Sequence, residues 1–191
     1  MEEYIDYFGQ NFGAKVLLGE FGAPIPDING PMKESEQAKF IDDIFHLLYK
    51  KKDNVEGINY WVLSNGSTKL LNDDGSPRQV VEIVKNYFIP GRIRGVVTNS
   101  LGERLKEIPV VTNEGYNSSV TDRFGAYTLV IPAGKAEVTI GGNGYKTVTK
   151  KFELTRDSEA TFDVTLEPEE SNPLYRFRLW ISDSLEFLHR K

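Results

Sequence analysis

The first part of the chain alternates apolar runs with amphipathic stretches. One run, residues 16–18 within AKVLLGEFGAP, has no period-two alternation, which is typical of a strand covered on both faces. The run GINYWVL at residues 57–63 has the same character. Between the two runs, apolar residues recur at helical spacing, which predicts an amphipathic helix with Ser35 as its N-cap and Lys52 at its end.

A second helix is predicted after the second apolar run. Ser76 and Gln79 fit an S-x-x-Q capping box, and Pro77 stands where the first helical residue is expected. Residues 2–12 are expected to form the end of an earlier helix. The order strand, helix, strand, helix indicates two βα units with parallel strands and a right-handed crossover.

The pattern changes after IPGR at residues 89–92. Short β-rich runs then alternate with Gly, Asn, Asp and Pro, which favours a small antiparallel β-sandwich and places a domain boundary near Pro90. From Glu169 the chain is interpreted as a linker or the start of a further module, with Tyr175, Phe177, Leu179 and Ile181 alternating as in an edge strand. The seven predicted strands are residues 93–98, 108–112, 119–121, 126–131, 136–140, 146–154 and 160–166.

Composition restricts the function classes. The 191 residues include 23 Lys and Arg against 28 Asp and Glu, a net charge of −5, and no basic stripe is interleaved with aromatics, so we expect no nucleic-acid partner. No apolar run could span a bilayer, and no signal peptide is apparent. The absence of cysteine excludes disulfides and thiolate metal sites. Asn65 and Asn117 lie in N-x-S sequons, which matter only in a secreted eukaryotic protein.

Three segments of the first domain resemble the last two βα units of clan A retaining glycoside hydrolases, which are (β/α)8 barrels. LLGEFGAP resembles the seventh strand with its catalytic nucleophile, GINYWVL the eighth strand with its sugar-stacking tryptophan, and LLNDDGSPR the loop before the last helix. The resemblance implies that Glu20 is the nucleophile and Trp61 a platform for the sugar. Tyr60, Asn59 and Asn65 are further candidates for contacts to the sugar hydroxyls.

The chemistry suits these residue types, but only part of the family's site is expected. A carboxylate must attack the anomeric carbon, and a retaining enzyme needs a second carboxyl group about 5–5.5 Å away. In the family that acid/base lies in an Asn-Glu pair on the fourth strand, for which the chain has no counterpart. Since general acid catalysis contributes about 10²–10⁴ in rate, the chain alone is expected to be inactive.

Other interpretations of these residues stay open. Glu20 could be a solvated strand-end carboxylate or an N-cap partner, and Trp61 a core aromatic. Asp73 and Asp74 are better explained by a turn than by catalysis or metal binding, and His46 and His189 by structural or solvated positions. No metal site and no cofactor are expected.

The second domain resembles the carboxypeptidase regulatory-like family of transthyretin-like sandwiches. The resemblance covers residues 92–167 and depends on GRIRGVVTNSLGERLKEIPVV and SSVTDRFGAYTLVIPAGKAEVTIGGNGYKT, in which Asp122 and Gly125 are expected to form a tight turn. No nucleophile or acid pair appears in it.

Taken together, the sequence predicts an α/β plus all-β chain with three parts. Residues 1–89 would be a partial (β/α)8 barrel and 90–168 a seven-stranded antiparallel sandwich, followed by the segment 169–191. The expected function is the C-terminal part of a retaining glycoside hydrolase acting on O-glycosidic bonds of a carbohydrate. The alternative is a non-catalytic carbohydrate- or protein-binding surface module. An extracellular or cell-surface location and self-association through open strand edges are also expected.

Overall fold

The computed structural model describes residues 1–113 and 118–169. They form two compact units that divide between Pro90 and Gly91, and each is described by itself. The predicted edge strand at residues 175–181, together with Asn117 and His189, lies outside the described residues. In the described part of the chain, no helix has both the length and the apolar character needed to cross a bilayer.

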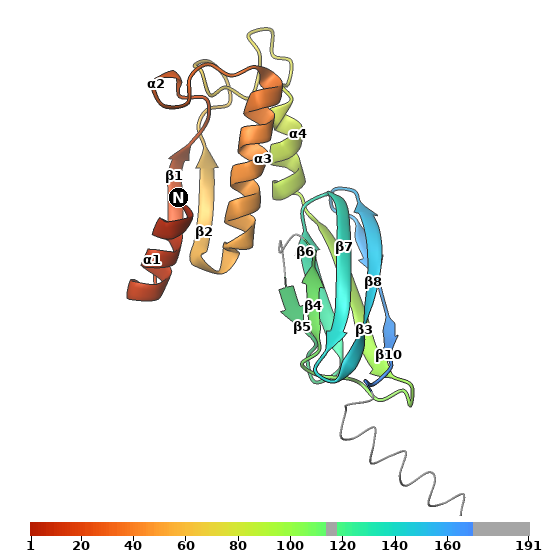
Figure 1. Cartoon of the computed structure of the whole chain (residues 1–191). Helices are drawn as coiled ribbons and strands as arrows, with labels where there is room; N and C mark the ends of the chain where they lie inside the picture. Colours follow the sequence, from red (N-terminus) through yellow and green to blue (C-terminus); the bar gives the residue numbers. More distant parts are fainter. Residues whose placement is uncertain (114–117, 170–191) are drawn as a thin grey trace, which may run out of the picture. The chain divides into compact units, whose positions relative to one another are not determined.

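The first unit contains one pair of strands and a set of helices (Figure 1). Strands β1 and β2 pair in parallel, as the sequence predicts, with Leu18 opposite Ile58 and Phe21 opposite Tyr60. The elements in chain order are α1 (Glu2–Phe12), β1 (Val16–Phe21), α2 (Pro26–Asn29), α3 (Glu34–Lys50), η1 (Lys52–Asn54), β2 (Val55–Tyr60) and α4 (Val80–Phe88).

Helices α3 and α4 cover one face of the β1–β2 pair. The buried stripe of α3, which includes Ile41 and Phe45, packs with Val80 of α4 and against Leu18 and Phe21 of β1. The opposite face of the pair is open, because Leu17 is 61% exposed. The sheet therefore has one packed face and one bare face.

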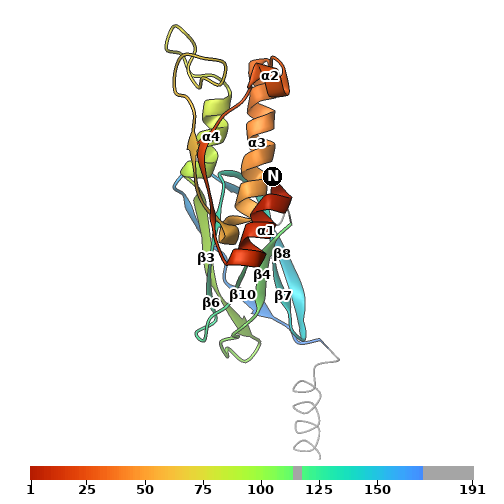
Figure 2. The ribbon, with the colours of Figure 1, turned by 90° about the vertical axis from the view of Figure 1, so that its left-hand side faces the viewer.

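Helix α1 is tied to the end of α3 by charge. The Lys51 ammonium pairs with Asp6 at 2.8 Å and with Glu2 at 3.1 Å, and Figure 2 shows α1 beside that end of α3. These two carboxylates raise the pKa of Lys51, chiefly through the hydrogen bond from its ammonium to Asp6.

Three expectations for the first unit need correction. Among the described residues, β1 and β2 form an open two-stranded sheet, so no (β/α)8 barrel is present. Helix α3 starts at Glu34 with Lys33 as N-cap, because the Glu36 carboxylate accepts a hydrogen bond from the Lys33 N–H at 2.8 Å. Helix α4 starts only at Val80, because Ser76 donates its N–H and hydroxyl to Asp74 instead of capping the helix.

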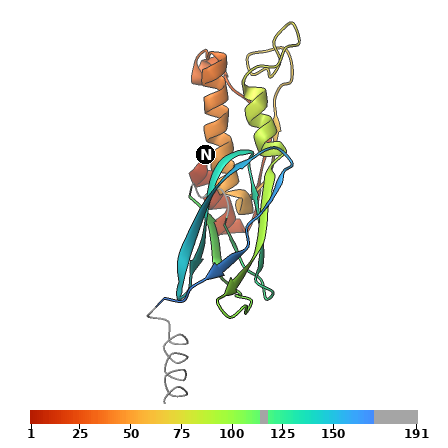
Figure 3. The same ribbon diagram turned by 90° about the vertical axis from the view of Figure 1, so that its right-hand side faces the viewer.

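The second unit is a β-sandwich of two sheets (Figure 3). One sheet has the order β10-β3-β6, with β9 also paired to β3, and the other has the order β5-β4-β7-β8. Its core includes the fully buried Ile93, Val97, Leu129, Ile140 and Leu166. The strands are β3 (Gly91–Asn99), β4 (Pro109–Thr112), β5 (Ser118–Val120), β6 (Ala126–Ile131), β7 (Gly134–Gly142), β8 (Tyr145–Leu154), β9 (Glu159–Thr161) and β10 (Val164–Leu166).

The sandwich differs from the prediction in its last strand. The run 160–166 is divided into β9 and β10, and both pair with β3 in parallel, so the described strands are neither seven nor all antiparallel. The division is explained by one side chain, since the Asp163 carboxylate accepts the Val96 N–H at 2.8 Å and takes the place of a backbone partner there. Tyr127 secures the same region by donating its buried hydroxyl to the Phe162 carbonyl at 2.7 Å.

Candidate functional site

Glu20 and Trp61 lie together at one edge of the β1–β2 pair. Because the strands are parallel, their carboxyl ends meet there, and the Trp61 N–H donates to the Phe21 carbonyl at 2.7 Å. Phe21 and Tyr60 face the helices, with their rings 6.2 Å apart. Glu20 lies where the register of β1 shifts, between Leu18 and Phe21, and Trp61 directly follows the last residue of β2. We call these two residues the rim site.

Both side chains of the rim site are accessible. The Trp61 indole is 58% exposed, so it is not a core aromatic. Glu20 is exposed, and none of the ion pairs or side-chain hydrogen bonds of the described residues involves its carboxylate. An accessible carboxylate beside an accessible indole can accept hydrogen bonds from hydroxyl groups while the ring covers an apolar face.

A buried amide connects the loops around the rim site. The Gln37 side chain of α3 is fully buried, and its Nε2 donates to the carbonyls of Ala23 at 2.8 Å, Lys69 at 3.2 Å and Thr68 at 3.4 Å. Its Oε1 accepts a hydrogen bond from Arg78 Nε at 2.8 Å. Sequence reasoning missed this group, although a glutamine one turn before Ile41, on the apolar stripe of the helix, was a usable signal.

The other predicted contact residues occupy different surroundings. The Tyr60 hydroxyl donates to the Thr68 carbonyl at 2.9 Å on the helix side of the sheet, and burial raises the pKa of this tyrosine. Tyr60 therefore helps to hold the loop after β2. Asn59 is exposed on β2, and Asn65 lies in that loop with a φ of 63°. The structure thus places Glu20 near the end of β1 and Trp61 directly after β2, whereas Tyr60 faces the helices.

The two aspartates of the loop serve in a turn. Asp73 forms an ion pair with Lys69, and Asp74 accepts hydrogen bonds from Ser76, which lower the pKa of Asp74. In the described ranges, no three His, Asp or Glu side chains are grouped so that they could hold a metal ion.

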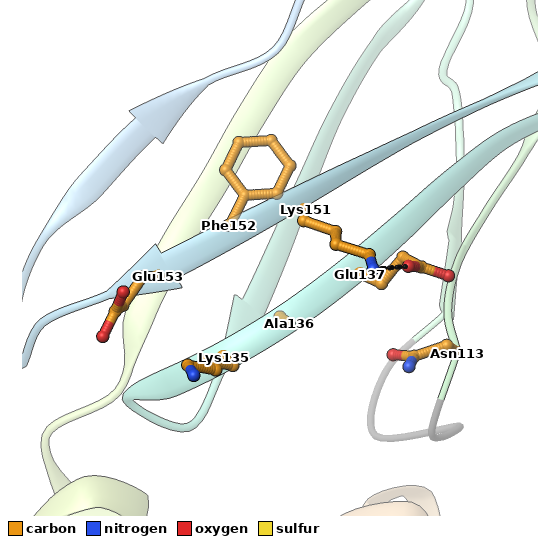
Figure 4. Close-up of a pocket in the computed structure, with 7 residues that line it drawn as sticks. All are labelled: Asn113, Lys135, Ala136, Glu137, Lys151, Phe152 and Glu153. Atoms are coloured by element: carbon orange, nitrogen blue, oxygen red, sulfur yellow. Dashed lines mark ion pairs between the residues drawn. The ribbon is translucent and has the colours of Figure 1, made fainter.

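The sandwich carries a surface hollow of its own on strands β7 and β8 (Figure 4). It has a volume of about 600 Å³, and its side chains include Lys135, Glu137, Lys151, Glu153 and Asn113. The Lys151 ammonium lies 3.6 Å from the Glu137 carboxylate, and Lys135 is opposite Glu153 in the register. The two cations and two carboxylates among these side chains give the hollow no net charge.

The turn at Asp122 forms as predicted. The Asp122 carboxylate accepts the N–H groups of Phe124 at 2.8 Å and Ala126 at 2.9 Å, and Gly125 has a φ of 71°. Asp122 is thus a turn residue, and its carboxylate is occupied by backbone donors.

Comparison with known proteins relates the second unit to a family of domains. The family model described as the carboxypeptidase regulatory-like domain matches residues 92–167. This part of the chain, which forms the β-sandwich, is therefore a carboxypeptidase regulatory-like domain. No curated protein matches the chain.

Several solved structures are similar at low identity. A putative membrane-associated protein of unknown function from Bacteroides fragilis is 20% identical, with a TM-score of 0.33 over 44% of this chain and 29% of that protein. Catechol 1,2 dioxygenase from Acinetobacter radioresistens is 13% identical, with a TM-score of 0.35 over 43% of this chain and 53% of the enzyme. The Bacillus anthracis TIE protein is 16% identical, with a TM-score of 0.36 over 60% of this chain and 20% of that protein. The chain thus spans less than two thirds of each, and at these values none informs its function.

Proposed function

We propose that the chain is a non-catalytic carbohydrate-binding surface module in which the rim site contacts the sugar and the sandwich is an accessory domain. The observation that carries this proposal is the exposed Trp61, whose N–H is bonded to the Phe21 carbonyl, one residue after the exposed Glu20. The proposal includes an extracellular or cell-surface location, where structural polysaccharides such as cellulose and mannan are found.

The physical basis is the two-sided character of a pyranose ring. One face of the ring is apolar and packs on an aromatic plane, while its hydroxyls need hydrogen-bond acceptors and donors. Trp61 supplies the aromatic plane and Glu20 a hydrogen-bond acceptor. The exposed Asn59 supplies both a hydrogen-bond donor and an acceptor. Binding sites of this kind combine an apolar surface with a few placed polar groups.

Trp61→Ala is expected to weaken the binding of cellohexaose or mannohexaose about tenfold or more, because an aromatic plane contributes on the order of 1–3 kcal/mol. Titration calorimetry with the full chain measures this change, and Trp61→Phe should keep part of the affinity. Phe88→Ala, which removes another exposed aromatic of the first unit, is the matched control and should bind as the parent does. Equal binding by the parent and Trp61→Ala would contradict the proposal, as would binding of protein ligands alone.

A second candidate function is suggested by the position of Glu20. We infer that the rim site can be half of a retaining glycoside hydrolase site, with Glu20 as nucleophile and Trp61 in the sugar subsite. Support comes from the parallel pairing of β1 and β2, which places both residues at the carboxyl ends of adjacent strands, where barrel enzymes carry their catalytic groups.

Self-association through the outer edges of the same two strands stays a prediction.

An activated substrate separates the two candidates, because a good leaving group needs no general acid. The Glu20 carboxylate would attack the anomeric carbon of 2,4-dinitrophenyl 2-deoxy-2-fluoro-cellobioside, form a C–O bond and release dinitrophenolate. Intact-mass spectrometry should then show one added fluoroglycosyl group in the parent and none in Glu20→Gln. Glu56→Gln, an exposed carboxylate of β2, is the control and should still be labelled. If the parent protein gains no fluoroglycosyl group, the glycoside hydrolase hypothesis is refuted and the binding proposal is unaffected.

A further inference from the structure

The Gln37 amide has a definite orientation in the interior of the first unit. An arginine Nε–H can only donate, so the group that accepts from Arg78 at 2.8 Å must be the amide oxygen. The amide nitrogen then faces three backbone carbonyls, which can only accept. Both ends of the amide are therefore matched to their partners, and no flipped arrangement satisfies them.

The carbonyls that receive the Gln37 nitrogen belong to two separate segments. Ala23 follows β1 three residues after Glu20, whereas Thr68 and Lys69 lie midway in the loop that begins at Trp61. Ala23 is fully buried and Thr68 is 8% exposed, so water has little access to replace the lost donor. A buried carbonyl left without a partner carries a free-energy penalty, and the segments would move to relieve it.

Two further contacts bring the same segments together. The Tyr60 hydroxyl donates to the Thr68 carbonyl at 2.9 Å, and the Leu70 N–H donates to the Val62 carbonyl at 3.2 Å, which closes the loop on itself. Neither contact reaches Ala23 as closely as Gln37 does, since the Tyr60 hydroxyl lies 3.4 Å from the Ala23 carbonyl. Gln37 is thus the main side-chain connection between the two segments among the described residues.

We propose that Gln37 is a positioning residue of the rim site, whose amide joins the segment after Glu20 to the loop after Trp61 and so fixes the two ligand-binding side chains relative to one another. This inference rests on the proposed function, because it gives the role of Gln37 in terms of that site. Fixing a site before the ligand arrives avoids the loss of freedom that binding would otherwise require.

The experiment follows the Trp61 ring directly, without a ligand. The chain contains two tryptophans, so Trp180→Phe leaves Trp61 as the only one, and 5-fluorotryptophan then gives a single ¹⁹F resonance. Gln37→Met removes the amide at similar volume. Gln37→Glu keeps the acceptor for Arg78 but turns a carboxylate toward the three carbonyls. Both variants should broaden or split the Trp61 resonance and raise the dissociation constant for cellohexaose about fivefold or more.

Two matched controls separate positioning from general stability. Ile41→Val changes a buried residue one turn further along α3, lowers thermal stability and should leave the Trp61 resonance unchanged. Gln79→Met removes an exposed glutamine and should be silent in both measurements. A sharp, parent-like resonance in both Gln37 variants would overturn the inference, as would equal broadening in Ile41→Val. If the parent binds no cellohexaose, the proposed function fails, while the ¹⁹F result still decides whether Gln37 positions the Trp61 loop.

Discussion

Gly95→Ala is expected to unfold the sandwich or lower its free energy of unfolding by about 3 kcal/mol or more. Gly95 lies in the middle of β3, opposite Tyr127. A Cβ atom at this position would lie 2.1 Å from the Phe162 carbonyl oxygen and 2.6 Å from its carbon. Both neighbours are backbone atoms of Phe162, which is held by the hydrogen bonds of its N–H to Arg94 and of its carbonyl to Tyr127, so neither can rotate away as a side chain could.

Scanning calorimetry of the full chain tests this expectation. The thermal unfolding transition of the first unit serves as an internal reference, because its melting temperature should not change in the variant. Gly102→Ala is the control within the sandwich. Its added Cβ meets no atom within 4 Å, and its φ of 78° should make the substitution cost only about 1 kcal/mol. A Gly95→Ala sandwich that melts at the parent temperature would show that β3 and Phe162 do not approach each other as described.

Gly22→Ala is expected to weaken oligosaccharide binding at the rim site about tenfold or more, with the sandwich intact. A Cβ on Gly22 would lie 2.0 Å from the Trp61 carbonyl oxygen and 2.9 Å from Thr68 Cβ. Either the segment after β1 or the loop after Trp61 must move, and each movement displaces the indole from Glu20.

The control for Gly22 lies three residues earlier, on β1. Gly19→Ala adds a Cβ that meets no atom within 4 Å, so its binding of cellohexaose should equal that of the parent. Titration calorimetry gives both affinities, and the thermal unfolding transition of the first unit reports whether the variant is folded. If Gly22→Ala binds as tightly as Gly19→Ala, the rim site does not depend on the approach of these two segments.

Local patterns in the sequence predicted most of the elements. The apolar runs around Leu18 and Ile58 became parallel strands, and the stripe through Ile41 and Phe45 became the buried face of α3. The run 126–131 matches β6 at both ends. These features depend on residues close in the chain, whose periodicity is visible before any tertiary contact forms.

Features that depend on distant residues were predicted wrongly or missed. The capping box at Ser76 did not form, because Asp74 competes for the serine and the following segment is engaged elsewhere, with the Arg78 N–H bonded to the Leu70 carbonyl. The division of the last sandwich strand depends on Asp163 meeting Val96, 67 residues away in the chain. No local pattern contains such a contact.

In the candidate site, too, the features that follow from the order of the elements were predicted, and those that depend on distant side chains were not. The position of Glu20 and Trp61 at adjoining strand ends followed from the order of the elements, and the described strands place them there. The Gln37 hydrogen bonds could not be derived, because they join residues up to 41 positions apart along the chain, as in the contact with Arg78. A polar residue on an otherwise apolar helix stripe is the pattern that indicates such a group.

The parallel pairing of β9 and β10 with β3 has a mechanical consequence. The first strand of the sandwich and its last two are direct neighbours, with Arg92 opposite Glu159 and Val97 opposite Val164. A force that pulls the two ends of this domain apart acts along these strands, so their hydrogen bonds are loaded in shear and must break together rather than one after another. The sandwich would therefore resist such a force through the pairing of its first strand with its last two.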